Sequence, residues 1–213
     1  KRSILSIKPK DYSAKRIITL GVLSIGIPAS LNSILMSFSN IMINSFMAKH
    51  GDLQLAGLGV AMKVNMIAVM LLIGVGTGIQ PLLGYCFGAG NSKRYRSVLK
   101  FSLCFAICLS IIMTLICYLG AAPLAKAFLD DEEAFGYAFA FSRIYIMSGP
   151  VLGILFVFIN AIQSMGAAIP SLILSVSRQG IIYFPILITT SIVNNTPVNL
   201  AMTQPITDYI ATA

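Results

Sequence analysis

Four charged side chains stand inside long apolar stretches, where a charge is unfavourable unless it meets a partner or water. They are Lys63, Arg143, Arg178 and Asp208. Asp208 is the only acidic residue in such a stretch, and its side chain is too short to reach a distant surface. We expect it either to pair with Arg178 or Lys63 or to bind a cation, and we favour pairing. The three basic side chains have a second interpretation, since long cationic side chains can extend to a membrane surface.

A polar stripe follows one face of an otherwise apolar segment near the N-terminus. Asn32, Met36 and Asn40 recur at i, i+4 and i+8, a spacing that puts them on one side of a helix. A second polar group follows in the next segment. Such side chains either hydrogen-bond neighbouring helices or line a water-accessible cavity. The candidates for a substrate cavity are Asn32, Met36, Asn40, Lys63, Asn65, Met66 and Arg143.

Prolines interrupt four of the apolar segments. A helical proline lacks an N–H and frees the carbonyl four residues before it, and in lipid such a carbonyl needs another donor. We predict an interruption at Gly26-Ile27-Pro28, and we expect Gly74 and Gly78 to admit a neighbouring backbone. These breaks favour a protein that bends its helices over a rigid scaffold. The candidate helix-break or gating residues are Pro28, Gln80, Pro81, Pro150 and Pro185.

The elements that carry these residues are predicted membrane-spanning helices. Of the 213 residues, 57% are hydrophobic and 10% are charged. A helix needs about 20 apolar residues to cross a bilayer. We predict helices at about 17–48, 53–87, 97–119, 135–163 and 171–189, and the start of a sixth from 199. The fold class is therefore all-α: a six-transmembrane-helix bundle.

The two ends suggest an internal fragment of a longer chain. Residues 1–16 are polar and basic and are interpreted as a linker, whereas 17–213 form the transmembrane unit. The stretch from Asn199 to the end is too short to cross a bilayer at about 1.5 Å per residue, so we expect the last helix to be truncated.

Lys and Arg gather in alternate loops, which predicts an orientation. Six lie in residues 1–16 and four in 88–100, but only Lys49 and Lys126 lie in the loops between. Because cytoplasmic loops carry the excess of positive charge, we place the N-terminus in the cytoplasm and the protein in the plasma membrane.

No pattern of an enzyme or metal site is present in the sequence. There is no nucleophile–base pair, phosphate-binding loop or metal cluster, so we expect no catalytic residue and no metal. The four cysteines are interpreted as small packing residues. The net charge of +8 reflects loop topology and attraction to lipid, and nucleic acid is not an expected partner.

The stretch that ends the second segment resembles a known family. Gly78-Ile79-Gln80-Pro81, followed by Gly84-Tyr85 and by Gly88-Ala89-Gly90-Asn91, is similar to the run that closes the eighth helix of multidrug and toxic compound extrusion (MATE) transporters. Weaker similarities are Gly26-Ile27-Pro28, the run 175–179, and Pro205-Ile206-Thr207-Asp208.

This resemblance implies that the chain is the C-terminal half, helices seven to twelve, of a twelve-helix antiporter. Its partner would be an N-terminal lobe of the same polypeptide. Such transporters export cationic or amphipathic drugs in exchange for sodium or protons by alternating access, and they use no cofactor. One branch has a glutamate where this chain has Met36, so that ion site does not transfer.

Three other functions are weighed against an antiporter. A flippase for lipid-linked or polysaccharide substrates would use Lys63, Arg143 and Arg178 to bind phosphates. A membrane-embedded enzyme would need a catalytic set, but only Asp208 is present. A structural subunit would not need four proline breaks.

Overall fold

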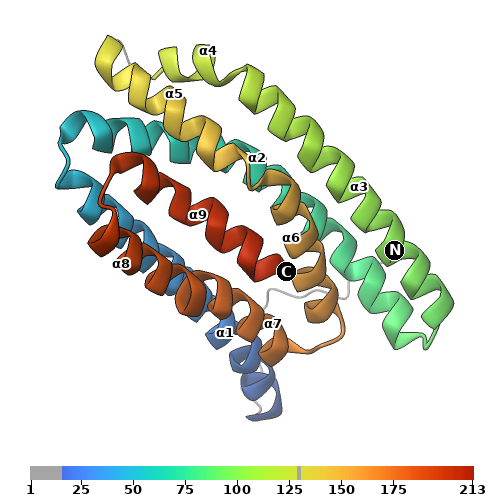
Figure 1. The fold of residues 1–213 in the computed structure, drawn as a ribbon. Helices are drawn as coiled ribbons and strands as arrows, with labels where there is room; N and C mark the ends of the chain where they lie inside the picture. Colours follow the sequence, from blue (N-terminus) through green and yellow to red (C-terminus); the bar gives the residue numbers. More distant parts are fainter. Residues whose placement is uncertain (1–15, 129–130) are drawn as a thin grey trace, which may run out of the picture.

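The computed structural model describes residues 16–128 and 131–213, which form a bundle of helices without a β-strand (Figure 1). Several side chains in the first half of the first helix, including that of Pro28, lie outside this description, as do residues 1–15 of the expected linker. The helices are α1 (Arg16–Ala48), α2 (Asp52–Gly88), α3 (Ser92–Leu119), α4 (Ala121–Lys126), α5 (Glu132–Ile146), α6 (Gly149–Ser164), α7 (Ala168–Val176), the π-helix η2 (Ser177–Ile182), α8 (Tyr183–Val193) and α9 (Pro197–Thr212).

Helix α2 is the centre of the bundle and packs against α3, α5 and α6. Two of its glycines allow this close packing. A Cβ added at Gly57 would lie 2.7 Å from the Cβ of Tyr137 and 2.9 Å from the backbone nitrogen of Ala138. A Cβ at Gly76 would collide with the side-chain amide of Asn160. Gly57 therefore fixes the approach of α5, and Gly76 fixes that of α6.

The expected role of Gly74 and Gly78 is wrong for contacts within this chain. A Cβ at either position would meet no atom within 4 Å. Both glycines are exposed on the side of α2 away from α5 and α6.

A second group of helices, α1, α7, η2, α8 and α9, packs along the other side of the bundle. One hydrophobic cluster joins the two groups, and its buried members come from α1, α2, α5, α8 and α9. They include Met47, Leu58, Phe141, Tyr183 and Leu200. Because each of these helices supplies a side chain to one core, the two groups form one unit.

The turns between long helices follow local backbone rules. Gly90 has φ 65°, a left-handed conformation that glycine adopts readily at the end of a helix. The side chain of Asn91 then accepts a hydrogen bond from the backbone N–H of Arg94 and caps α3. Asp131 caps α5 in the same way through Glu133 and Ala134.

The predicted segments agree with the observed helices, but two of them are more complex than predicted. The fourth segment consists of α5 and α6, which are bent by 47°. The fifth contains η2. The predicted interruption at Gly26-Ile27-Pro28 is wrong as a break in secondary structure, because α1 is one helix from Arg16 to Ala48. Likewise, α2 continues through Pro81.

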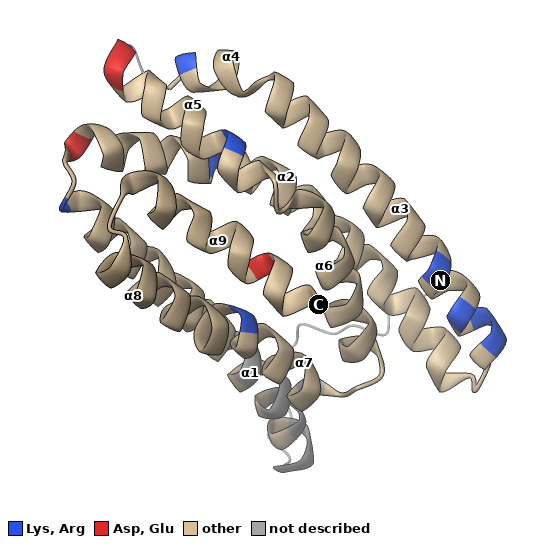
Figure 2. Cartoon of the chain, in the orientation of Figure 1, with Lys and Arg blue, Asp and Glu red and all other residues tan. Residues whose placement is uncertain are grey.

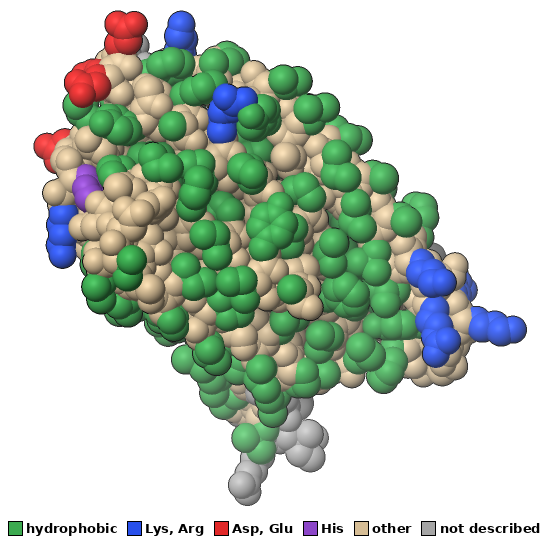
Figure 3. Space-filling view, viewed as in Figure 1, with side chains coloured by type: hydrophobic (Ala, Val, Ile, Leu, Met, Phe, Trp, Pro, Cys, Tyr) green, Lys and Arg blue, Asp and Glu red, His purple; other side chains and the backbone are tan. Residues whose placement is uncertain are grey.

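Three helical segments within the described residues are long and apolar enough to cross a membrane. They are Asp52–Gly88, Ser92–Leu119 and Ile169–Val193, and the bent pair α5–α6 makes a fourth if it counts as one span. Figure 2 shows a group of Lys and Arg at the turn between α2 and α3, whereas the acidic residues outside α9 lie at the opposite end of the bundle, together with other basic residues. Apolar side chains cover much of the face between these ends (Figure 3). The molecule thus has the charge distribution of a membrane-spanning bundle.

Candidate functional site

Arg178 and Asp208 form a buried ion pair between η2 and α9. Arg178 Nε lies 2.7 Å from Asp208 Oδ1. The Asp208 side chain is 0% exposed and that of Arg178 is 18% exposed. Gln204, one turn before Asp208, also donates to Oδ1, at 3.3 Å. The sequence left two possible partners for Asp208, Arg178 and Lys63. The structure contains the pair with Arg178.

The second oxygen of Asp208 has a different environment. Oδ2 is buried and has no hydrogen-bond partner among the described residues. The carboxylate is therefore paired on one side only. An oxygen in this situation is normally unfavourable, and the short contact at Oδ1 with a charged donor offsets part of that penalty.

The π-helix η2 places Arg178 at this site. Pro185 follows η2 closely and has no N–H, so the regular hydrogen-bond ladder is incomplete here. Ser39 of α1 supplies an additional donor: its Oγ lies 3.1 Å from the carbonyl of Gln179 and 2.9 Å from that of Leu35. One π-helical turn is therefore joined to α1 by Ser39 and to α9 by Arg178. We call Ser39, Arg178, Gln179, Gln204 and Asp208 the polar junction.

Arg143 lies apart from the polar junction, in a cradle of aromatic rings. Its guanidinium carbon is 4.0 Å from the ring centroid of Tyr118 and 5.2 Å from that of Phe139. Arg143 Nη2 donates to the Tyr118 hydroxyl. Its Nε is buried without a hydrogen-bond partner in the described structure. We call Tyr118, Phe139 and Arg143 the aromatic cradle.

Lys63 is likewise not paired with Asp208. It is exposed, and its Nζ lies 5.3 Å from the ring centroid of Phe128. Lys63, Arg143 and Arg178 thus have three separate environments. Within the described residues these three side chains do not gather into one cationic group of the kind that a flippase would use to bind phosphates, and that alternative is not favoured.

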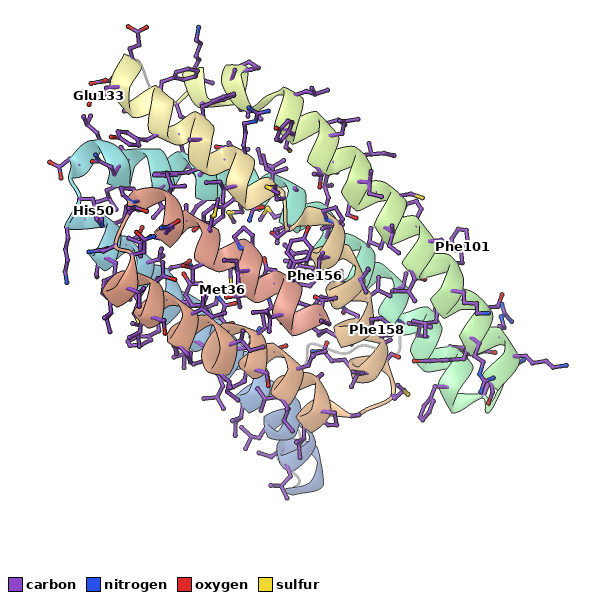
Figure 4. The ribbon with its side chains drawn as sticks, in the orientation of Figure 1. Met36, His50, Phe101, Glu133, Phe156 and Phe158 are labelled. Atoms are coloured by element: carbon purple, nitrogen blue, oxygen red, sulfur yellow. The ribbon has the colours of Figure 1, made fainter. Side chains whose placement is uncertain are left out.

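The polar stripe on α1 is open to the outside of the bundle. Met36 is 54% exposed, Asn40 is exposed, and Asn32 is half-buried. On α2, Met66 is 54% exposed and Asn65 is half-buried. Figure 4 labels Met36 on α1 and His50 at the turn into α2. His50 Nε2 is 2.9 Å from Asn195 Oδ1, which joins this turn to the α8–α9 loop.

The predicted break residues occupy different positions. Gln80 is half-buried, and Pro81 is exposed on the continuous helix α2. Pro150 is in the first turn of α6, immediately after the 47° bend. Pro185 follows η2 in the first turn of α8. Two of the prolines therefore adjoin a real change of helix geometry.

Sequence reasoning missed Ser39, Gln179 and Gln204 as members of the site. The spacing of Gln204 and Asp208 at i and i+4 was an available signal. No local signal connects Ser39 with Gln179, because 140 positions separate them.

Apolar spans, a bent segment, a π-helical break and a buried ion pair within them define a helical membrane protein of the transporter class. The chain belongs to the MatE family, whose family model matches residues 28–189. This finding confirms the resemblance seen in the sequence.

Known relatives agree with this assignment. The multidrug export protein MepA of Staphylococcus aureus (strain NCTC 8325 / PS 47) is 26% identical over 189 residues, which are 86% of this chain and 40% of MepA. The chain thus spans less than half the length of this curated relative.

Solved structures show the same fold. A MATE protein in complex with MaL6 has a TM-score of 0.88 at 19% identity, with 98% of this chain and 47% of that chain covered. The MATE transporter VcmN of Vibrio cholerae, in its bent form, has a TM-score of 0.83 at 20% identity, with 97% and 47% covered. The bundle is one lobe of such a transporter.

Proposed function

We propose that this chain forms the C-terminal lobe of a secondary antiporter that exports cationic or amphipathic compounds in exchange for sodium or protons. The proposal rests on the family assignment and on the name of MepA as a multidrug export protein. The lobe would begin at 17, after the basic linker of residues 1–16, and would face an N-terminal lobe across a central cavity.

One observation carries this proposal: α1 and α2 expose side chains suited to amphipathic cations. Met36 and Met66 are each 54% exposed. Asn32 and Asn40 lie four residues before and after Met36 on the same helix, and Asn65 immediately precedes Met66. Thioethers adapt to ligands of varied shape, and amides accept hydrogen bonds without a fixed charge. A wall of this composition fits varied drugs better than it fits one substrate.

The coupling ion would bind elsewhere than the polar junction. Oδ1 of Asp208 is already engaged by Arg178, whose charge opposes the binding of a second cation. Met36 replaces the carboxylate that one branch of the family has on this helix. We therefore propose that the carboxylate that couples transport belongs to the opposing lobe.

Dye efflux by the full-length transporter tests the cavity wall. Met36→Ala and Met66→Ala should each slow ethidium efflux severalfold, while expression stays the same. Ile112→Ala on α3 is a matched control, because Ile112 is 53% exposed and lies outside the proposed wall. Equal efflux rates for all three variants would show that Met36 and Met66 do not line the substrate cavity.

Alternating access would use the helix breaks. We propose that Gln80, Pro81, Pro150 and Pro185, together with Pro28, allow the spans to bend between states. Pro28→Ala and Pro81→Ala in the full-length transporter should insert normally and transport slowly. Unchanged turnover in both would make these prolines packing residues.

The orientation is also part of the proposal, with residues 1–16 in the cytoplasm and the protein in the plasma membrane. A cysteine introduced at Ser92 should react with an impermeant maleimide only after cells are permeabilised, whereas one at Asp52 should react in intact cells. The native cysteines would first be replaced by alanine. The reverse labelling pattern would invert the orientation.

A further inference from the structure

The aromatic cradle holds a cation that has no acidic partner. The described residues contain one ion pair, Arg178–Asp208, and Arg143 takes no part in it. Instead, Arg143 contacts two ring faces and the Tyr118 hydroxyl, and its buried Nε remains without an acceptor. A guanidinium presents donors in a planar fork that matches a phosphate group. The guanidinium of Arg143 is therefore suited to bind a phosphate.

The aromatic cradle lies near the C-terminal end of α3, a candidate membrane span. Tyr118 is the last residue but one of α3, a span of 28 apolar-rich residues that ends at Leu119. Because Arg143 bonds the Tyr118 hydroxyl, its guanidinium lies at this end of the span. Tyrosine is enriched at the boundary between hydrocarbon and headgroups. An anion within reach of Arg143 would be a lipid phosphate at the same depth.

An apolar groove starts at the cradle and follows α3 toward the middle of the bundle. Its volume is about 380 Å³. It is lined by Ile111, Thr114, Leu115 and Tyr118 of α3 and by Met147 and Pro150 at the α5–α6 bend. Tyr118 belongs to both the groove and the cradle. From Tyr118 to Ile111 the groove runs roughly 10 Å along the helix axis, at 1.5 Å per residue.

The 47° bend between α5 and α6 borders this groove. Met147 lies between the two helices, and Pro150 is in the first turn of α6. At the start of α6, Gly149 packs closely against Thr114 of α3. Ile111 and Leu115, which line the groove, are 51% and 56% exposed.

We infer that the aromatic cradle and this groove together bind one anionic phospholipid, with the phosphate on Arg143 and one acyl chain against α3. The inference rests on charge complementarity at Arg143 and on the continuity of the cradle with the apolar groove. A phosphate ion alone would leave the groove unused, whereas a zwitterionic lipid would bring its own cation to Arg143. The site does not depend on the transported substrate or on the coupling ion.

Native mass spectrometry of the full-length transporter in detergent tests this site. The probes are phosphatidylglycerol and phosphatidylcholine with identical acyl chains, added in equal amounts. The wild type should retain phosphatidylglycerol roughly tenfold more strongly, because the choline cation of phosphatidylcholine would lie near the guanidinium of Arg143. Arg143→Gln should abolish this preference, and Arg143→Lys should keep part of it. Thermal midpoints close to that of the wild type should show that both variants fold.

One groove variant and two controls separate binding of the acyl chain from binding of the phosphate. Leu115→Trp fills the groove and should lower retention of phosphatidylglycerol while Arg143 is intact. Ile112→Trp, on the same helix but outside the groove, and Lys100→Gln, at the other end of the bundle, are the controls and should bind as wild type. Equal retention of both lipids by the wild type, or an unchanged preference in Arg143→Gln, overturns the inference. Loss in Arg143→Gln with none in Leu115→Trp also overturns it, because the site would then bind only an anion.

Discussion

The polar junction and the aromatic cradle each contain an arginine in a membrane-spanning region, and they stabilise it differently. Arg178 has a carboxylate from another helix at 2.7 Å, and that carboxylate is fully buried. Arg143 has ring faces, a hydroxyl and no acidic partner among the described residues. We relate the difference to position in the bundle, since Arg143 bonds Tyr118 near the end of α3. A charge in the middle of the bundle needs a counter-charge, whereas a charge near the surface can use rings and lipid.

The largest expected effect is at the polar junction. Asp208→Asn in the full-length transporter leaves Arg178 buried without its counter-charge, which should cost about 3–5 kcal/mol. Folding yield and thermal midpoint should fall together, as measured by size-exclusion chromatography and a thermal shift assay. Glu132→Gln, at the exposed start of α5, is the control and should change neither.

A double-mutant cycle sharpens this result. Arg178→Gln combined with Asp208→Asn removes both charges, so the pair should be less destabilised than the sum of the single variants. Additive effects would mean that the two side chains are not coupled. A stable Asp208→Asn variant that lost only its ion dependence would instead assign Asp208 to ion binding.

The second effect concerns the frame that supports the aromatic cradle. Helix α5 carries Arg143 and packs against Gly57 of α2, where an added methyl group would overlap Tyr137 and Ala138. Gly57→Ala should therefore destabilise the protein by about 1–3 kcal/mol through overpacking. Gly59→Ala, where no atom lies within 4 Å, should be neutral or slightly stabilising. Similar thermal midpoints for the two variants would contradict this packing.

A smaller effect is expected from the donor that Ser39 supplies to η2. Ser39→Ala removes the hydrogen bonds to the carbonyls of Gln179 and Leu35 and should cost about 1 kcal/mol. Ser45→Ala is the matched control, since its hydroxyl bonds only Ile41 in its own helix and is exposed. Chemical unfolding of both variants measures the difference. If Ser45→Ala lost as much stability, the contact between α1 and η2 would not be the cause.

The smallest expected effect is Arg143→Met. This change removes the cation–π contacts with Tyr118 and Phe139, worth about 0.5–1 kcal/mol, and leaves no carboxylate unpaired. The thermal midpoint should therefore fall far less than in Asp208→Asn. If the thermal midpoint fell as far as in Asp208→Asn, the aromatic cradle and the polar junction would not differ in how they stabilise an arginine.

The sequence predicts the spans well because their apolar length is a local property. It also singles out Asp208, because one acid in an apolar stretch is conspicuous. It cannot choose between Arg178 and Lys63 as its partner, since that choice depends on how α9 packs against η2. The glycines of α2 also show that tertiary packing decides which residues meet a neighbouring helix. Gly74 and Gly78 have the expected spacing, yet Gly57 and Gly76 meet neighbouring helices, because the buried side of α2 is decided by α5 and α6.

Prolines predicted only part of the pattern of helix breaks, because two of the predicted breaks lie within continuous helices. A proline removes a donor wherever it stands, yet the surroundings decide how the helix responds. Helix α2 continues through Pro81, whereas the span that contains Pro185 adopts η2. The role of Ser39 is also a tertiary property, because it needs α1 to lie beside a residue 140 positions away.

The π-helical turn changes the angular phase of the span that contains it. A π-helix closes its hydrogen bonds at i+5 where an α-helix closes them at i+4, so η2 accommodates one residue more than an α-helical turn would. One residue corresponds to about 100° of rotation around a helix axis. The residues of α8 are therefore shifted by one position relative to the helical periodicity of α7, although both halves belong to one span. Deleting one residue within Ser177–Ile182 would let this turn close as an α-helix, with the side chains of α8 still directed toward α9.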